Sequence, residues 1–364
     1  MIRKNKTIRP GDSQMNELRL APLALPEGFE WCDLDINRPI DLLNLYTFLN
    51  NHYVSDDTLR FNYSQEFLYW ALSPPGYKKQ WHIVVRSSNI RQTIIGFISA
   101  IPVNIIVNNK SYPMVEINFL CVHTNARNHR LAPVLIAEIT RRVNIDGIYH
   151  GLYTGGIKFD NLITTSNYYL RPINHRKLLD IKFLYLSRNQ TLNKHIKHYH
   201  LPKLTSINLI KLEKNDIPEV FVRLKDYLKK FAVYHDFNLE DFDYWFLNNI
   251  IQCFVVKDQN GNVTDMVSYL VIQSTILNHN VHRILNVGYL WYYFSTKTPI
   301  ALLLKNLLII AQNNNVDVFN CLDIQDNMKF IDELRFNKGT GQLHYYIQNL
   351  QLKCNPSNIG IILV

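Results

Sequence analysis

The stretch VEINFLCV, residues 115–122, decides the fold together with the loop and helical pattern that follow it up to residue 143. It has strand length and β-forming side chains, yet it contains a carboxylate, Glu116, and an amide, Asn118. A cationic loop, residues 127–130, comes next, and Pro133 suits the first turn of a helix. Polar groups on a strand, a cationic loop and the amides of a helix N-terminus predict an anion site beside a reactive centre. Phosphates are the expected anions.

Composition limits the class of protein. The 364 residues are 47% hydrophobic, which predicts a globular protein large enough for two domains. The five cysteines are odd in number and widely spaced, so we expect neither disulfides nor a metal site, and a reducing compartment such as the cytoplasm. No apolar run has membrane-spanning length, and we expect no transmembrane segment. The charge of +9 would suit nucleic acid, an anionic membrane or an anionic cofactor.

The first half of the chain shows an ordered series of patterns. Residues 1–22 lack periodicity and are expected to form a flexible arm. The following patterns predict helices at 41–49 and 65–72, strands at 80–86, 93–104 and 114–122, a helix from 132, and a strand at 148–154. No strand is predicted between 161 and 204. The histidines of that segment are expected on a solvated cationic helix face: His195, His198 and His200.

The second half repeats this order of elements. The patterns predict a helix at 218–231, a hairpin of strands 251–257 and 263–272, a strand at 287–294, a helix at 299–312 and a strand at 316–321. The repetition indicates a duplicated mixed α/β unit, with halves at 23–205 and 206–364 forming one continuous body. The chain closes with strand patterns at 342–348 and 359–364, so we expect the carboxylate of Val364 to be buried.

Motifs spread over residues 20–364 closely resemble those of the N-myristoyltransferases. They are LPEGFEW (25–31), YSQEFL (63–68), GFISAIP (96–102), EINFLCVH (116–123), RLAPVLI (130–136), EITRRV (138–143), NHRKL (174–178), STILNH (274–279) and KC (353–354). The resemblance implies a duplicated, saddle-shaped GNAT-type fold. It also implies transfer of myristate from myristoyl-CoA to the N-terminal glycine amine of client proteins, by a cytoplasmic enzyme that we expect to be monomeric.

The resemblance also assigns residues. The backbone amides of Phe119 and Leu120 would form an oxyanion hole, with Asn118 and Thr154 near the attacking amine. The contacts to myristoyl-CoA would come from Phe119, Leu120, Cys121, Val122, Asn128, Arg130, Leu131 and Ala132. The peptide would meet Asp56, Asp57, Leu59, Phe61, Tyr63, Tyr153, Tyr168, Phe183, Ser274, Tyr292 and Leu343. We assign His123, next to the motif, to structure or cofactor packing.

Four features depart from the family pattern. The lid motif expected upstream of residue 25 is absent, and the acidic loop before Leu59 is two residues short, with Ser55 where an acid is common. Leu170 replaces a groove histidine, and Thr340 replaces an acid in the glycine-rich loop near the end. These changes affect the expected peptide selectivity and not the reaction.

The resemblance makes the terminal carboxylate of Val364 the candidate general base. An N-terminal amine has a solution pKa of about 8 and an α-carboxyl group one of about 3.5, so proton transfer is uphill in water. Burial raises the second pKa and lowers the first, which makes the transfer workable. Two rival hypotheses remain: a GNAT-type acyltransferase acting on other amines, and a basic module that binds RNA or the ribosome through residues 182–203.

Overall fold

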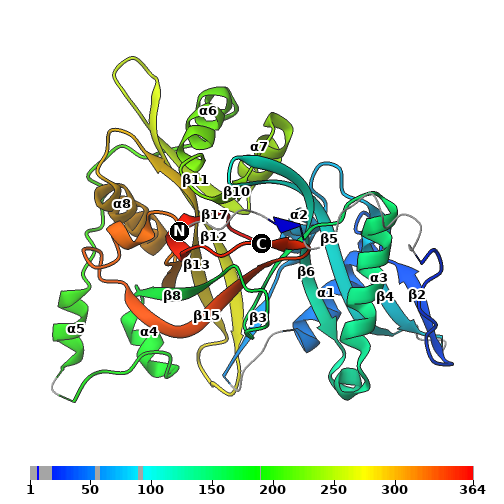
Figure 1. Ribbon diagram of the computed structural model, residues 1–364. Coiled ribbons are helices and arrows are strands. Elements are labelled where there is room, and N and C mark those ends of the chain that lie inside the picture. The colour runs from blue at the N-terminus through cyan, green and yellow to red at the C-terminus, as the bar shows by residue number, and fades with distance from the viewer. Residues whose placement is uncertain (1–5, 8–18, 54–57, 89–92, 189, 364) are drawn as a thin grey trace.

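The first half of the chain folds in the predicted β-β-β-α-β order (Figure 1). The computed structural model describes residues 6–7, 19–53, 58–88, 93–188 and 190–363. A long antiparallel hairpin is followed by a helix and by a strand that runs parallel to the second strand of the hairpin. The elements are β2 (Phe29–Asp33), α1 (Pro39–His52), β3 (Leu59–Asn62), α2 (Gln65–Leu72), η3 (Lys79–Trp81), β4 (His82–Ser87), β5 (Ile94–Val107), β6 (Lys110–Val122), η4 (Thr124–His129), α3 (Leu131–Ile145) and β7 (Gly151–Gly155).

The second half repeats this arrangement, as predicted. Strands β12 and β13 form the long hairpin, α8 follows, and β14 lies parallel to β13. The elements are β9 (Ile210–Lys211), η5 (Lys214–Asp216), α6 (Ile217–Leu228), β10 (Val233–His235), α7 (Leu239–Phe246), β11 (Ile251–Lys257), β12 (Val263–Ile276), β13 (Ile284–Ser295), α8 (Ile300–Asn313), β14 (Val318–Leu322) and η6 (Asn327–Lys329).

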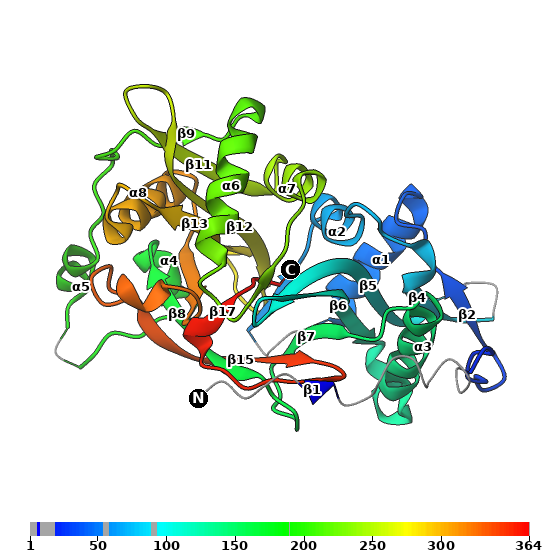
Figure 2. The same ribbon diagram turned by 45° about the horizontal axis from the view of Figure 1, so that its top comes forward.

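The remaining elements connect the two units. They are β1 (Lys6–Thr7), β8 (Thr164–Pro172), α4 (His175–Asp180), α5 (Leu192–His198), β15 (Asn337–Ile347), β16 (Leu350–Gln351), η7 (Pro356–Asn358) and β17 (Ile359–Gly360). In the described residues a 15-stranded sheet has the order β17-β10-β5-β6-β7-β15-β8-β14-β13-β12-β11-β9, with β2, β3 and β4 off this path. Strand β3 of the first half pairs with β12, and β15 of the second half pairs with β7. The halves therefore exchange strands and form one body (Figure 2).

Two expectations fail in the connecting region. Strand β8 lies between β15 and β14, in a segment where no strand was predicted, because its polar residues hide the pattern of a buried strand. His195 is buried rather than solvated, and its ring packs 4.9 Å from that of His175. In the expected arm, Lys6–Thr7 form β1, which pairs antiparallel with β16.

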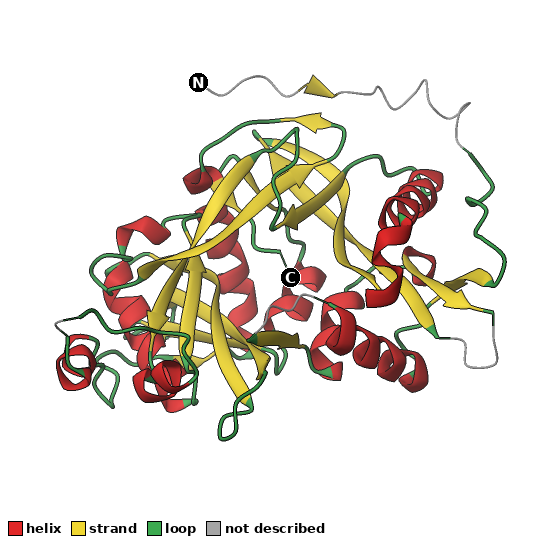
Figure 3. Ribbon diagram, turned by 90° about the horizontal axis from the view of Figure 1, so that it is seen from below, coloured by secondary structure: helices red, strands yellow, loops and turns green. Residues whose placement is uncertain are grey.

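Helices hold the long hairpin of the first half in place. The apolar face of α3 packs on β5 and β6, where Leu135, Ile139 and Val143 are buried with Ile98 and Val115. Helix α2 spans the predicted residues 65–72 and is capped by Ser64, whose hydroxyl accepts a hydrogen bond from the Phe67 amide at 3.1 Å. Seen from below, the C-terminal segment runs inward toward the centre of the molecule (Figure 3). This places the last part of the chain beside the hairpin β5–β6.

Candidate active site

An opening between two parallel strands forms the centre of the candidate site. Strands β6 and β7 pair only at Val115↔Gly151 and Glu116↔Leu152 among the described residues. Asn118 and Thr154 lie two residues further along their strands, beyond the last paired position, and both are half-buried. In-register residues of parallel strands point to the same face, and side chains repeat every second residue. The predicted polar pair therefore lies on one face of the opening.

A bulge in β6 adjoins this opening. Asn118 pairs with Ser99 and Cys121 with Phe97, so Phe119 and Leu120 both lie opposite one residue of β5. Phe119 has φ +54°, a left-handed conformation that costs a non-glycine residue about 1–3 kcal/mol. The Ser99 hydroxyl donates a hydrogen bond to the Asn118 carbonyl at 2.8 Å. Ser99 was not predicted as a site residue, yet it fixes the backbone just before the bulge.

Aromatic side chains hold the bulge from the other side. The buried ring of Phe119 lies 5.5 Å from Tyr63 and 5.8 Å from Tyr53, measured between ring centroids. Burial raises the pKa of Tyr53 to about 12 and that of Tyr63 well above its ordinary value, so both remain neutral phenols. Tyr63, predicted to meet the peptide, is thus in contact with the predicted oxyanion residue.

The loop after β6 turns sharply into α3. Arg130 has φ +55° and precedes the helix, which begins at Leu131, one residue before the expected start. The side chains of Asn128 and Arg130 are exposed, whereas those of Leu131 and Ala132 are half-buried. Arg127 donates hydrogen bonds to the Val122 carbonyl at 3.3 Å and to the carbonyl of His52. Arg130 is therefore the arginine of the predicted cationic loop that projects outward.

Two histidines brace this loop. The rings of His52 and His123 lie 4.0 Å apart, and His123 Nδ1 accepts a hydrogen bond from the Asn125 amide at 3.2 Å. Burial, and then His123 and Arg127, lower the pKa of His52. These contacts agree with a structural role for His123 and leave it bound within its own loop.

A buried ionic network fixes α3. The carboxylate of Glu138 has no exposed surface and accepts hydrogen bonds from Arg141 at 2.6 Å and Arg142 at 2.7 Å. Burial alone would raise the pKa of Glu138, but the hydrogen bonds from the two arginines outweigh it and lower that pKa. Arg142 also reaches Asp33 and the Gln80 carbonyl. The second half of α3 is therefore held against β2 and η3.

Several predicted peptide residues gather along β3. Phe61 pairs with Ser274 across the β3–β12 ladder, and the rings of Phe61 and Tyr63 stack at 5.6 Å. Leu59 and Phe183 both pack against one small apolar cluster. Asp56 and Asp57 lie outside the described residues.

A second group lies on strands β7, β15 and β8. Tyr153 stacks on Tyr346 with centroids 5.0 Å apart, and Leu343 pairs with Ser166. Burial raises the pKa of Tyr168 to about 12, and Tyr168 in turn contributes to the raised pKa of Tyr63. Tyr63 on β3 and Tyr168 on β8 are therefore near neighbours, so the two groups of predicted peptide residues converge.

Tyr292, also predicted to meet the peptide, lies on β13. Its side chain is fully buried, its hydroxyl accepts a hydrogen bond from the Ile362 amide at 3.0 Å, and it contacts His235 Nδ1 at 2.6 Å. Because its ring is covered by protein in this conformation, the assignment of Tyr292 to the peptide groove stays a prediction. Tyr292 instead anchors the C-terminal segment.

That segment approaches the opening between β6 and β7. Ile359 and Ile361 are buried in one cluster with Leu152, and Leu363 packs against it. A Cβ on Gly360 would lie 2.5 Å from Phe231, so only glycine fits here without a shift. Val364, the predicted base, lies outside the described residues.

The two substituted groove positions are neighbours in space. Leu170 pairs with Asn337, and a Cβ added to Gly339 would lie 3.5 Å from Leu170 Cδ1. Thr340, which follows Gly339, is exposed. The departures from the family pattern therefore change one local surface at the end of β8.

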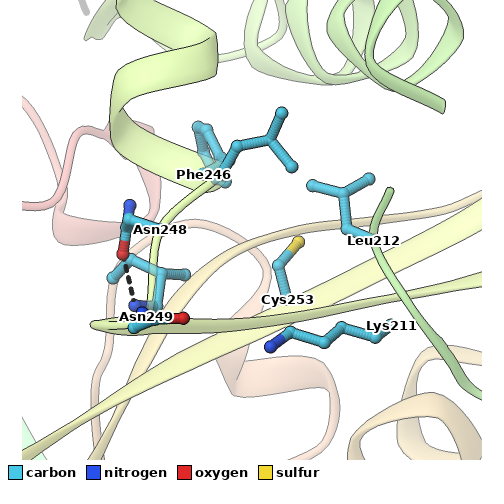
Figure 4. A pocket seen from close by; sticks show the side chains of 8 residues that line it. Lys211, Leu212, Phe246, Asn248, Asn249 and Cys253 are labelled. Atoms are coloured by element: carbon cyan, nitrogen blue, oxygen red, sulfur yellow. Dashed lines mark hydrogen bonds between the residues drawn. The ribbon is translucent and has the colours of Figure 1, made fainter. Parts of the chain in front are cut away.

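A separate pocket of about 200 Å³ lies at the far edge of the sheet (Figure 4). It is lined by residues of β9, β11 and the end of α7, including Lys211, Phe246 and Cys253. Burial raises the pKa of Cys253, so its thiol stays protonated. In the described residues no group of His, Cys, Asp and Glu is arranged to hold a metal, and no helix is long and apolar enough to cross a membrane.

Comparison with a solved structure defines the class of fold. A GCN5-related N-acetyltransferase from Anabaena variabilis superposes with a TM-score of 0.50 at 10% identity, covering 88% of this chain and 72% of that one. The mixed sheet with a helix between splayed parallel strands is therefore a GNAT-type fold, as predicted.

Closer relatives give the family. The profile of the N-terminal domain of myristoyl-CoA:protein N-myristoyltransferase matches residues 10–166, and that of its C-terminal domain matches 180–361. The glycylpeptide N-tetradecanoyltransferase of Drosophila melanogaster is 41% identical over 100% of this chain and 78% of its own length; that of Plasmodium falciparum is 39% identical over 97% and 87%. Saccharomyces cerevisiae N-myristoyltransferase with bound myristoyl-CoA superposes with a TM-score of 0.93 at 36% identity, covering 99% of this chain and 91% of that one. The chain belongs to the N-myristoyltransferase family of acyltransferases.

Proposed function

We propose that this protein transfers the myristoyl group of myristoyl-CoA to the N-terminal glycine amine of client proteins. The observation that carries the proposal is the bulge at Phe119 and Leu120, which adjoins the opening between β6 and β7 in a chain about 40% identical to named glycylpeptide N-tetradecanoyltransferases. An acyltransferase acting on other amines and an RNA-binding module have no comparable support. The cytoplasm is the expected location.

The donor would bind along β6 and the start of α3. Arg130 is exposed where the helix begins, and a cation beside the amides of a helix N-terminus attracts phosphate. Its neighbours on the donor side would be Cys121, Val122, Asn128, Leu131 and Ala132. The thioester carbonyl would then lie at the bulge, within reach of the Phe119 and Leu120 amides.

The chemistry needs a base and an oxyanion site. The glycine nitrogen, held between Asn118 and Thr154, would attack the thioester carbon, and the amides of Phe119 and Leu120 would stabilise the negative oxygen. The C–S bond then breaks and the CoA thiolate leaves. The proton from the amine would pass to the carboxylate of Val364, because burial brings the pKa values of the two groups together.

The peptide would continue along β3 and β8, past Tyr63, Phe61, Tyr168 and Phe183, with Asp56 and Asp57 meeting basic residues. Because Leu170 and Thr340 replace polar groups, we expect a weaker preference for lysine near the seventh peptide position. A site that loses a polar partner discriminates less, by about 1–3 kcal/mol.

Single-turnover acyl transfer, followed by mass spectrometry, tests the proposal. A peptide that starts with glycine is incubated with myristoyl-CoA and each of three proteins: the unchanged chain, one extended beyond Val364, and one lacking Val364. We expect myristoylation by the first and a loss of about 10² or more in rate for the others. A folded, extended protein that works at the unchanged rate would exclude the terminal carboxylate as base.

A further inference from the structure

Glu116 is a buried carboxylate beside the opening between β6 and β7. The proposed reaction assigns it no role. Its side chain is 2% exposed and lies on β6, two residues before Asn118, so both side chains project from the same face of the strand. The Asn118 side-chain amide donates a hydrogen bond from Nδ2 to Glu116 Oε1 at 2.8 Å. Glu116 is therefore joined directly to a residue proposed to meet the incoming amine.

This contact determines which way the Asn118 amide faces. The oxygen and nitrogen of an asparagine side chain can exchange places with little change in shape, so only hydrogen-bond partners decide between the two orientations. An ionised carboxylate accepts hydrogen bonds but donates none. With Nδ2 held by Glu116, Oδ1 must face away from it. No donor among the described residues hydrogen-bonds to Oδ1.

Glu116 lies near the C-terminal segment of the chain. Burial raises the pKa of Tyr292 and of Tyr345, and the nearby charge of Glu116 adds to both effects. Tyr292 also binds the amide of Ile362. The negative charge of Glu116 therefore lies near the C-terminal segment, on the face of β6 that meets the opening.

We propose that Glu116 is a positioning residue, which holds Asn118 Oδ1 toward the substrate so that the site selects an N-terminus able to donate hydrogen bonds. The inference rests on the proposed function, because it takes Asn118 as a contact of the glycine amine. A protonated or neutral amine can donate to Oδ1. If the amide turned over, its NH₂ group would oppose the incoming ammonium.

The variant Glu116→Gln tests this role with almost no change in shape. Glutamine can donate a hydrogen bond to Asn118 Oδ1, so the amide of Asn118 becomes able to turn over. We expect kcat/KM for a glycine peptide to fall roughly 10- to 100-fold, the range for a hydrogen bond to a charged group, with unchanged affinity for myristoyl-CoA. In an Asn118→Ala background the same change should alter kcat/KM less than twofold.

A binding measurement gives a readout that does not depend on catalysis. Calorimetry compares a glycine peptide bearing a free amine with the same peptide N-acetylated. The unchanged protein should prefer the free amine, and Glu116→Gln should lose that preference. Asp317→Asn provides the matched control, because Asp317 is another buried carboxylate, bound to Lys177 and to the Asn286 amide, and its loss should leave the preference intact.

The outcomes separate the two proposals. An equal fall in kcat/KM with and without Asn118, or no fall in either background, would overturn the positioning role. If the thermal transition shows that Glu116→Gln does not fold, Glu116→Asp replaces it. The shorter acid keeps the carboxylate but withdraws it from Asn118. An unchanged preference of Glu116→Asp for the free amine would likewise overturn the positioning role. A protein that prefers the free amine through Glu116 yet transfers no myristate would sink the proposed function and leave the positioning role standing.

Discussion

Gly96 and Asp265 occupy the same position in the two halves of the molecule. Each is the third residue of a 14-residue strand, and each pairs with the last residue of the next strand, Val122 or Ser295. Both hairpins also carry a bulge, at Phe119 and Leu120 in the first half and opposite Ser268 in the second. The two halves therefore share the same strand pairing, but one has glycine at this position and the other has aspartate.

In the second half the carboxylate fills the turn. Asp265 Oδ1 accepts hydrogen bonds from the amides of Thr296 at 2.7 Å, Lys297 at 3.0 Å and Thr298 at 3.1 Å, and the Thr298 hydroxyl donates to Oδ2 at 2.8 Å. Burial would raise the pKa of Asp265, but these hydrogen bonds lower it. The chain thus supplies its own anion between β13 and α8.

In the first half, the described residues place no carboxylate at the corresponding turn. No carboxylate among the described residues accepts a hydrogen bond from residues 123–132, and the space above Gly96 is taken by Leu131 and Leu135 of α3. The loop also has eight residues, 123–130, against four in the second half, 296–299. If the first half binds the phosphates of myristoyl-CoA as proposed, the duplicated fold keeps one anion site for a ligand and fills the other with its own side chain.

Gly96→Asp would break the comparison most strongly. Its Cβ would lie 2.9 Å from Leu135 Cδ1 and 3.0 Å from Leu131 Cδ2, and its carboxylate would enter the apolar contact that holds α3. We expect the start of α3 to shift, the free energy of unfolding to fall by roughly 3 kcal/mol, and the affinity for myristoyl-CoA to fall on the order of 10²-fold.

Calorimetry and thermal unfolding check this result. Gly151→Ala is the control, because its added Cβ would lie 3.7 Å from the nearest neighbour, an ordinary contact. Unchanged donor affinity in a folded Gly96→Asp protein would mean that α3 does not form the donor site.

Asp265→Ala tests the other half. Three amides and the hydroxyls of Thr264 and Thr298 would lose their acceptor. We therefore expect the free energy of unfolding to fall by roughly 3 kcal/mol, with the kcat of acyl transfer unchanged. The exposed amides would then form an anion site, and sulfate should restore part of the lost stability.

The measurement is the thermal transition in sulfate and in sodium chloride of equal ionic strength. A sulfate effect that is the same for the variant and the unchanged protein would show that the amides do not gather an external anion.

The fold was largely predictable because its signals are local. The hairpin strands and α3 follow from alternation, helical spacing and Pro133, and the repeat follows from the order of the elements. Strand β8 escaped prediction because it is buried only through pairing with β14 and β15, which are distant in sequence. Its residues Ser166 and Arg171 are polar yet buried, so no local pattern marks them.

The site was predictable in its residue types but less in their orientation. The family motif supplied Phe119 and Asn118, whereas Ser99 lay unmarked within an apolar run. For Tyr292, the sequence does not show whether the aromatic ring faces a ligand or the core. Its hydrogen bond to the Ile362 amide depends on the return of the C-terminal segment, which no local pattern encodes.

Tyr292, in the second half of the chain, anchors the C-terminal segment through the Ile362 amide. Acid should weaken this anchor. Burial lowers the pKa of its partner His235 to about 3, below an ordinary value of about 6.5. As pH falls below that ordinary value, the unfolded chain binds a proton that the folded chain excludes, so stability is full above pH 6.5 and declines below it. The loss per pH unit is about 1 kcal/mol.

His235→Asn should reduce this pH dependence, because an asparagine oxygen can accept from Tyr292 without titrating. Thermal transitions at pH 7 and pH 5 measure it. Buried His82 and His175, whose pKa values burial also lowers, keep part of the slope in both proteins. Identical slopes for the two proteins would show that His235 is not the group that titrates.

The smallest expected effect comes from two serine variants that compare the two bulges directly. Ser99 and Ser268 are both fully buried, and each is the sixth residue of its strand. The Ser99 hydroxyl donates to the Asn118 carbonyl beside the first bulge at 2.8 Å, and the Ser268 hydroxyl donates to the Tyr292 carbonyl within the second bulge at 2.6 Å. Replacing either by alanine should lower the free energy of unfolding by about 1 kcal/mol, since one buried hydrogen bond is lost.

The two variants should differ only in catalysis. Ser99→Ala releases the backbone before Phe119 and should lower the single-turnover rate about 3- to 10-fold, because oxyanion donors act only when they are held in place. Ser268→Ala relaxes a bulge filled by aromatic side chains and should leave that rate unchanged. Equal rates for the two variants would mean that the Ser99 contact does not position the proposed oxyanion hole. The two bulges would then differ in the residues around them and not in the need for a fixed backbone.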